Sequence, residues 1–282
     1  MGLRIATNVA SLTSQRHLRE TRELLDRSLE RLSSGYRINR AGDDAAGLAI
    51  SEKLRAKIKG LVQAQRNSSD GVSLIQVAEG GLNEVGNILV RLRELGVQAA
   101  SDTIGNKERK FLDLEYQSLK DEIDRIANST EFNGSYLLDG TGGSLDFQVN
   151  TGGDNLLGVD RISFDAFKLD VNTDKLGLDQ LSVKSKVDAQ HSLSQIDNAI
   201  ESVSSTRAEL GAIENRLSST IRNLGVSVEN LSAARSRIKD VDIAEETAEL
   251  TKHNILMQAG TAVLAQANNA PKMALALLQN QG

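Results

Sequence analysis

The chain has 282 residues, of which 39% are hydrophobic and 25% are charged, and its formal net charge is −5 at pH 7. This composition supports a packed core and argues against wholesale disorder, while the acidic balance argues against a general nucleic-acid-binding protein. The sequence contains no cysteine and only three scattered histidines. Disulfides, thiolate metal sites and cysteine catalysis are therefore excluded, and we expect no metal or other cofactor.

The N-terminal segment MGLRIATNVASL has no apolar core region and no small-residue cleavage site of the kind that secretory signal peptides carry. No stretch of the chain is apolar enough to be a single membrane-spanning helix. We therefore expect no membrane span, and any export would have to use a route that leaves the N-terminal region in place.

Periodic apolar residues predict three helical zones in the first half of the chain. The first zone has leucines at a seven-residue spacing and ends near Gly35; the leucines are Leu18, Leu25 and Leu32. Apolar residues alternate by three and four over 75–92, with a similar pattern upstream at 54–61. A shorter helix is predicted over 112–126, after a loop at 101–106.

The residue pattern changes between Asn133 and about Gly177, where glycines divide the chain into short segments. One of these, 144–150, has Leu145, Phe147 and Val149 in strict alternation, which is typical of a strand. We predict one or two β-hairpins in this region. The glycines lack the Gly-Lys-Ser/Thr ending and the following helix of a phosphate-binding loop, so hairpin turns are the better interpretation.

A strict seven-residue repeat runs through the second half of the chain and predicts a helix of about 60 Å with an apolar seam. Its members are Ile196, Val203, Leu210, Leu217, Leu224, Leu231 and Ile238. Arg207 and Glu214 occupy the other seam position in the middle of the repeat, where polar residues can set the register of the packing.

The C-terminal tail is unusually poor in charge, because Lys272 is the only charged residue between Asn254 and Gly282. It continues a seven-residue apolar spacing at Ile243, Leu250, Met257 and Leu264. A helix of this kind invites association if water surrounds it. We therefore expect it to bury against the N-terminal helix, against other copies of the chain, or both.

Asp43 and Asp44 form an adjacent acidic pair that could suggest acid–base catalysis. They stand directly before Ala45-Ala46-Gly47, where a helix is predicted to begin. Carboxylates at that position accept hydrogen bonds from free backbone amides. Helix capping is therefore the favoured interpretation, and no constellation of residues supports an enzyme.

Two long regions resemble bacterial flagellin. The N-terminal hallmark is LSSGYRINRAGDDAAGLAI over 32–50, followed by similar stretches over 65–101 and 122–134. The C-terminal region of the family is matched over 210–268, which includes QAGTAVLAQAN. The likeness covers roughly residues 1–135 and 190–282 in the same order as in the family.

The resemblance implies a mainly α fold, with long coiled-coil helices from both chain termini and an elongated helical bundle. Residues 1–43 and 239–282 would pair as the inner core of a filament, and 44–238 would form the bundle, with its β-hairpin region near 134–177. The polymer-core contacts would be Leu18, Leu25, Leu32, Ile243, Leu250, Met257 and Leu264. Only some 50 residues separate the two matched regions, so we expect a minimal subunit without extra outer domains.

The resemblance also implies the function: a structural, non-enzymatic subunit that self-assembles into the extracellular filament of the bacterial flagellum, which sister flagellins could share. Implied partners are the flagellar export apparatus, a flagellin chaperone, and the cap and junction proteins. Candidate contacts with an animal toll-like receptor are Arg91, Leu95, Gln98 and Glu115. The alternatives are a hook-filament junction protein and a secreted host-receptor-binding protein; the long match over 210–268 favours the filament subunit.

Overall fold

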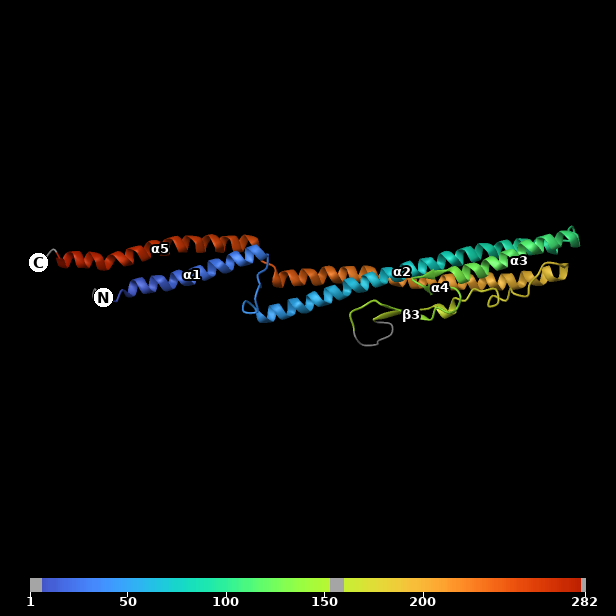
Figure 1. Ribbon diagram of the computed structural model, residues 1–282, viewed down its shortest axis with the longest axis horizontal. Helices are drawn as coiled ribbons and strands as arrows, with labels where there is room; N and C mark the ends of the chain where they lie inside the picture. The colour runs from blue at the N-terminus through green and yellow to red at the C-terminus, as the bar shows by residue number, and fades with distance from the viewer. Residues whose placement is uncertain (1–6, 153–159, 280–282) are drawn as a thin grey trace. The chain divides into compact units, whose positions relative to one another are not determined.

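A computed structural model describes residues 7–152 and 160–279, and it is dominated by long helices (Figure 1). The helices are α1 (Val9–Ser34), α2 (Ala45–Ala100), α3 (Asn106–Ser129), α4 (Lys186–Lys239) and α5 (Ile243–Gln279). The short strands are β1 (Glu131–Phe132), β2 (Ser135–Tyr136), β3 (Ser144–Gln148) and β4 (Arg161–Asp165), and β4 runs into the short helix η1 (Ala166–Lys168). The predicted mainly α fold is confirmed.

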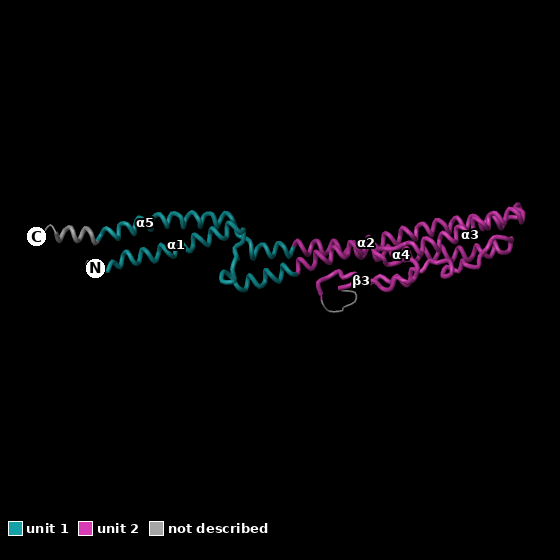
Figure 2. Tube along the Cα trace, in the orientation of Figure 1, with its two compact units in different colours: residues 1–56, 230–282 teal, residues 57–229 magenta. Residues whose placement is uncertain are grey.

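The chain divides into two compact units (Figure 2). The first unit consists of Met1–Ala56 and Asn230–Gly282, and the second of Lys57–Glu229. The predicted division into 1–43 with 239–282 and 44–238 concerns subunits inside a filament, so it stays a prediction.

The second unit is built on one hydrophobic core that α2, α3 and α4 share with the hairpin region. The seven-residue repeat of α4 faces this core, and Ile196, Val203, Leu210 and Leu217 are all at most 2% exposed. The two polar seam residues bond across to α2, with Arg207 3.5 Å from Glu79 and Glu214 accepting from Gln76 at 2.9 Å. These cross-helix pairs fit the predicted role of Arg207 and Glu214 in setting the register.

Two β-hairpins are present where one or two were predicted. Strands β1 and β2 are joined by Asn133 and Gly134, whose φ angles of 51° and 78° are those of a tight turn that matches the strand twist. Strands β3 and β4 pair in antiparallel fashion from Ser144↔Asp165 to Gln148↔Arg161. A Cβ atom at Gly71 of α2 would lie 3.1 Å from the ring of Phe147, so this glycine lets β3 approach the helix. The observed hairpin region begins at Glu131, slightly before the predicted start near 134. Residues 153–159 of the predicted region lie outside the described residues.

Three charged side chains of α3 hold the irregular segment 169–185 against the helix. Asp113 accepts from the amide of Val183 at 2.9 Å, Lys120 donates to the carbonyls of Asp179 and Leu181 at 2.6 and 3.3 Å, and Asp124 accepts from the amide and hydroxyl of Thr173, both at 2.8 Å. Because Asp113 and Lys120 are buried, these bonds replace water for backbone groups that would otherwise be left without partners.

Arg109 closes the turn between α2 and α3. Its guanidinium donates to the carbonyls of Ala99 and Ser101 at 2.8 and 2.9 Å and to the side chain of Asn106 at 2.9 Å. The last carbonyls of a helix lack partners within the helix, so Arg109 acts as a side-chain cap for α2.

Candidate functional site

The first unit is organised around the antiparallel pair of α1 and α5, which lie side by side (Figure 1). Asn8 caps the start of α1 through a 3.1 Å bond from the amide of Ser11, and its side-chain nitrogen donates to the carbonyl of Ala267 at 2.8 Å. Gly35 ends α1 in the left-handed conformation, with φ 73°, as the predicted stop requires.

Six of the seven residues predicted as polymer-core contacts are half-buried within this pair: Leu18, Leu25, Leu32, Leu250, Met257 and Leu264. The packing is close at Gly260, where a Cβ atom would lie 2.8 Å from Leu18 Cδ2. Ile243 differs from the other six, because 54% of its surface is exposed at the start of α5. The seven-residue spacing therefore describes mainly a seam between two helices of the same chain.

A second set of apolar side chains on the same helices remains exposed. We call it the outer apolar set; it consists of Val9, Leu12, Leu24 and Leu29 on α1 and Ile243, Ile255, Leu256 and Val263 on α5. Each of these side chains is between 43% and 61% exposed. Large apolar side chains that stay exposed in one unit are available for contact with another molecule.

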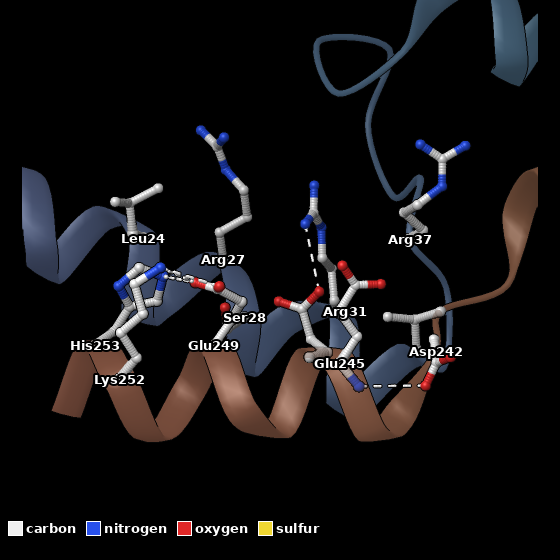
Figure 3. A pocket seen from close by; sticks show the side chains of 12 residues that line it. Leu24, Arg27, Ser28, Arg31, Arg37, Asp242, Glu245, Glu249, Lys252 and His253 are labelled. Carbon is white, nitrogen blue, oxygen red and sulfur yellow. Dashed lines mark hydrogen bonds and ion pairs between the residues drawn. The ribbon is translucent and has the colours of Figure 1, made fainter. Parts of the chain in front are cut away.

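A groove of about 480 Å³ lies along the pair near the start of α5 (Figure 3). Its lining mixes both signs of charge, with Arg27 and Arg31 from α1 and Glu245, Glu246 and Glu249 from α5. Arg31 lies 3.4 Å from Glu246, and this is the ion pair that links α1 to α5 among the described residues.

His253 also lines the groove, and only 10% of its side chain is exposed. Its Nε2 lies 3.5 Å from Glu249, and its Nδ1 has no partner among the described residues. Sequence reasoning missed this buried histidine. The available signal was the seven-residue spacing of Glu246, His253 and Gly260, which runs parallel to the apolar repeat.

The first unit contains two short linkers: 35–44 joins α1 to α2, and 240–242 joins α4 to α5. The two linkers are hydrogen-bonded to each other. Tyr36 and Asp240 form an antiparallel bridge, in which the amide of Arg37 donates to Lys239 at 2.7 Å and the amide of Val241 donates to Gly35 at 3.1 Å. The fixed linkers define where α1 and α5 leave the ends of α2 and α4 that belong to this unit.

Of the acidic pair, Asp44 caps the start of α2, as predicted, whereas Asp43 holds the linker before the helix. Asp44 Oδ1 accepts from the amide of Gly47 at 2.8 Å, which is the bond that an N-cap residue makes. Asp43 accepts from the amides of Arg40 and Asn39, and these bonds, led by that of Arg40, hold the pKa of its carboxyl below the usual value.

The residues suggested as receptor contacts lie in the second unit on α2 and α3. Arg91 bonds to Glu94 and Glu115, each at 2.8 Å, and these partners raise the pKa of its guanidinium. Gln98 is exposed and lines a shallow groove on α2. Leu95 is only 1% exposed and belongs to the core. The structure therefore brings Arg91 and Glu115 together on the surface and places Leu95 beneath it.

Within the described residues, no helix combines the length and the apolar character that a bilayer crossing needs. In the same part of the chain, no three His, Cys, Asp or Glu side chains come together in a way that could hold a metal ion.

Comparison with known proteins identifies the molecule. Residues 5–142 match the N-terminal helical region of bacterial flagellin, and residues 193–278 match its C-terminal helical region. The chain belongs to the bacterial flagellin family. It is 46% identical to a flagellin of Halalkalibacterium halodurans over 96% of this chain and 98% of that protein. It is 45% identical to a flagellin of Bacillus subtilis over 98% of this chain and 100% of that protein.

Solved structures agree with this assignment. Bacillus cereus flagellin matches 60% of this chain and 94% of its own length, with 32% identity and a TM-score of 0.50. A putative flagellar hook-associated protein of Vibrio parahaemolyticus is similar in fold, with a TM-score of 0.57 over 70% of this chain and 100% of its own, but it is only 18% identical. As a flagellin, the chain is a structural subunit of the flagellar filament, and this function is favoured over that of a junction or receptor-binding protein.

Proposed function

We propose that copies of this flagellin join through the outer apolar set of α1 and α5, so that residues 1–43 and 239–282 form the inner core of the filament and 44–238 form the bundle around it. The observation that carries the proposal is that this helix pair has a half-buried apolar seam between its two helices and a second apolar set that is exposed. The inner seam holds the pair together, and the outer set is free to bind neighbours.

The arrangement suits an open polymer. Burying a large apolar side chain contributes about 1.5–3 kcal/mol, and the outer apolar set supplies several such side chains on each copy. A contact between different patches of neighbouring copies repeats indefinitely if its rotation does not close into a ring, which gives a helical filament. No catalytic step is part of this function.

We also propose that the assembled protein lies outside the cell and reaches it through the flagellar export apparatus, with a flagellin chaperone before assembly and the cap and junction proteins at the filament ends. Membership of the flagellin family supports this proposal. Sequencing the N-terminus of filament protein tests the route, because cleavage about 15 to 30 residues in would indicate a signal peptide.

Recognition by an animal toll-like receptor stays a prediction. Three of the four residues, Arg91, Gln98 and Glu115, are exposed, so a partner could contact them. Leu95 is buried and would contribute by packing beneath that surface. Receptor activation by free subunits, compared between wild type and Arg91→Ala, tests this prediction directly.

The assembly proposal is tested with two charges on the outer apolar set. Leu256 and Val263 are 47% and 57% exposed and lie seven residues apart on α5. A variant with Leu256→Asp and Val263→Asp should fold normally as a free subunit, because both side chains are already hydrated there. It should fail to elongate filament fragments, because a carboxylate buried without a partner costs several kcal/mol.

The matched control places the same two charges on exposed polar residues of the same helix with the same spacing, Thr251→Asp and Gln258→Asp. We expect the control to elongate far better than the test variant. Normal elongation by the test variant would contradict the assignment, and equal failure of the control would show that added charge on α5, rather than the apolar set, blocks assembly.

A further inference from the structure

Lys239, the last residue of α4, contacts two segments that are far from it in the sequence, α2 and the first linker. Its Nζ lies 3.3 Å from Oε1 of Glu52 in α2 and 5.0 Å from the centre of the Tyr36 ring in the first linker. Its carbonyl accepts the 2.7 Å bond from the amide of Arg37. Only 14% of the side chain is exposed, so these contacts hold the ammonium in place.

The Tyr36 contact has the geometry of a cation–π interaction, because the ammonium stands within about 6 Å of the ring centre. Its strength increases when water is excluded, as it is around this side chain. Lys239 therefore attracts the linker through the ring of Tyr36 and α2 through the carboxylate of Glu52 at the same time.

The backbone around Lys239 supports the same arrangement. The guanidinium of Arg37 donates to the carbonyl of Ile238 at 2.8 Å, and the Tyr36–Asp240 bridge joins the two linkers. Ile38, in the same linker, is 1% exposed, and its buried side chain anchors the linker before α2 begins. The side chain of Lys239 lies where these interactions converge.

We propose that Lys239 is a positioning residue for filament assembly: it clamps the two linkers together and so fixes the direction in which α1 and α5 leave the ends of α2 and α4. This inference rests on the assembly proposed above. A subunit adds to a filament only when its contacting surfaces are oriented correctly. Without the contacts of Lys239, the direction of α1 and α5 would have to be fixed during each addition, which would slow elongation.

The test variant is Lys239→Met, which keeps a flexible stem over Tyr36 and removes the ammonium. Glu52 keeps a partner in this variant, because Arg55 lies 2.6 Å from it. We expect elongation of wild-type filament fragments to slow about tenfold while the melting curve of the free subunit, followed by circular dichroism, stays the same. Lys239→Arg keeps the charge and should elongate nearly as fast as wild type.

The matched control is Lys252→Met, which removes a lysine from α5 whose side chain is 60% exposed and whose partner, Glu249, is one turn away. This variant should elongate like wild type. If Lys239→Met elongates as fast as Lys252→Met, the inference is overturned. It is also overturned if the Lys239→Met subunit melts at a clearly lower temperature, because Lys239 would then be needed for folding itself.

A disulfide provides an independent check, since the natural chain has no cysteine. Tyr36 and Asp240 are partners in an antiparallel bridge, a spacing that a disulfide can span. With Tyr36→Cys and Asp240→Cys added to Lys239→Met, oxidation should restore elongation and reduction should remove it again. A disulfide that forms without restoring elongation would show that holding the linkers is not what Lys239 does.

The two proposals fail in different ways. If the wild-type chain itself does not elongate filament fragments, the assembly function is wrong. If wild type and Lys252→Met elongate and slowing is confined to Lys239→Met, the assembly function stands and the clamp is supported.

Discussion

Leu18 of α1 packs against the bare backbone of α5 at Gly260, where a Cβ atom would lie 2.8 Å from Leu18 Cδ2 and 3.2 Å from Leu18 Cγ. Glycine costs a helix interior about 1 kcal/mol relative to alanine, so its presence in α5 needs a compensating benefit. The benefit is close contact between the two helices at this level of the seam.

This contact predicts that a larger side chain at position 260 can be compensated by a smaller one at position 18. Gly260→Val should disturb the pair, because overpacking costs about 1–3 kcal/mol, and it should raise the subunit concentration needed for filament growth. Leu18→Ala in the same chain removes the obstructing atoms and should recover much of the loss. The four critical concentrations of wild type, both single variants and the double variant form a cycle; strictly additive effects would contradict direct contact.

A charge in the seam should separate assembly from the stability of the second unit. Leu264 is half-buried on α5, and an unpaired carboxylate in such a place costs several kcal/mol once the seam closes fully in the polymer. We expect Leu264→Asp to abolish elongation of filament fragments while the melting temperature of the helical bundle is unchanged. Leu264→Met is the control and should elongate. A large drop in melting temperature would mean that Leu264 belongs to the same cooperative unit as the bundle.

Tyr116 predicts a pH-dependent difference in stability. Its ring is fully buried in the core and its hydroxyl makes no hydrogen bond of good geometry among the described residues. Burial raises the pKa of Tyr116 to about 12, an effect that its neighbour Ser192 partly offsets. Because the folded-state pKa is raised, the stability associated with this proton is complete below about pH 10, the unfolded value, and is lost as the pH rises from there toward 12.

Tyr116→Phe removes this proton. The variant should be as stable as wild type or slightly more stable at pH 8, since the unpaired hydroxyl is gone. Between pH 8 and pH 11 the wild type should lose about 1 kcal/mol more than the variant. Urea unfolding at several pH values measures the difference, and parallel curves for the two proteins would rule out this role of Tyr116.

Lys120 should be needed to hold segment 169–185 on α3. Lys120→Met leaves the carbonyl of Asp179 without its donor and the carbonyl of Leu181 with Gln117 alone, which should lower the free energy of unfolding by about 1–3 kcal/mol. Lys107→Met, an exposed position on the same helix, should change it by less than about 0.5 kcal/mol. Urea denaturation of both variants provides the comparison, and equal stabilities would show that the segment is held by its apolar contacts alone.

The helices could be predicted from the sequence because their signals are local. The seven-residue repeat of α4, the stop at Gly35 and the cap at Asp44 each depend on residues within a few turns of one another. The Asn133-Gly134 turn has the same local character. Each of these features has one structural interpretation that fits its spacing.

The contacts of Lys239 could not be predicted in this way. Lys239 meets Tyr36 across about two hundred residues of sequence, and nothing in the neighbourhood of either residue indicates the other. The interpretation of the seam was also incomplete, because spacing alone does not say whether an apolar stripe faces its own chain or another copy. Exposure separates the half-buried Leu264 from the outer Val263, which are adjacent in the sequence.

The side chain of Arg109 affects which sequence changes the loop between α2 and α3 can tolerate. Because it donates from the first turn of α3 to the carbonyls of Ala99 and Ser101, these two groups need no side-chain donor from the loop between the helices. Substitutions at Thr103 or Ile104 leave those bonds untouched. Relatives that keep an arginine at this place are therefore free to vary the loop, or to lengthen it, while both helices keep their ends.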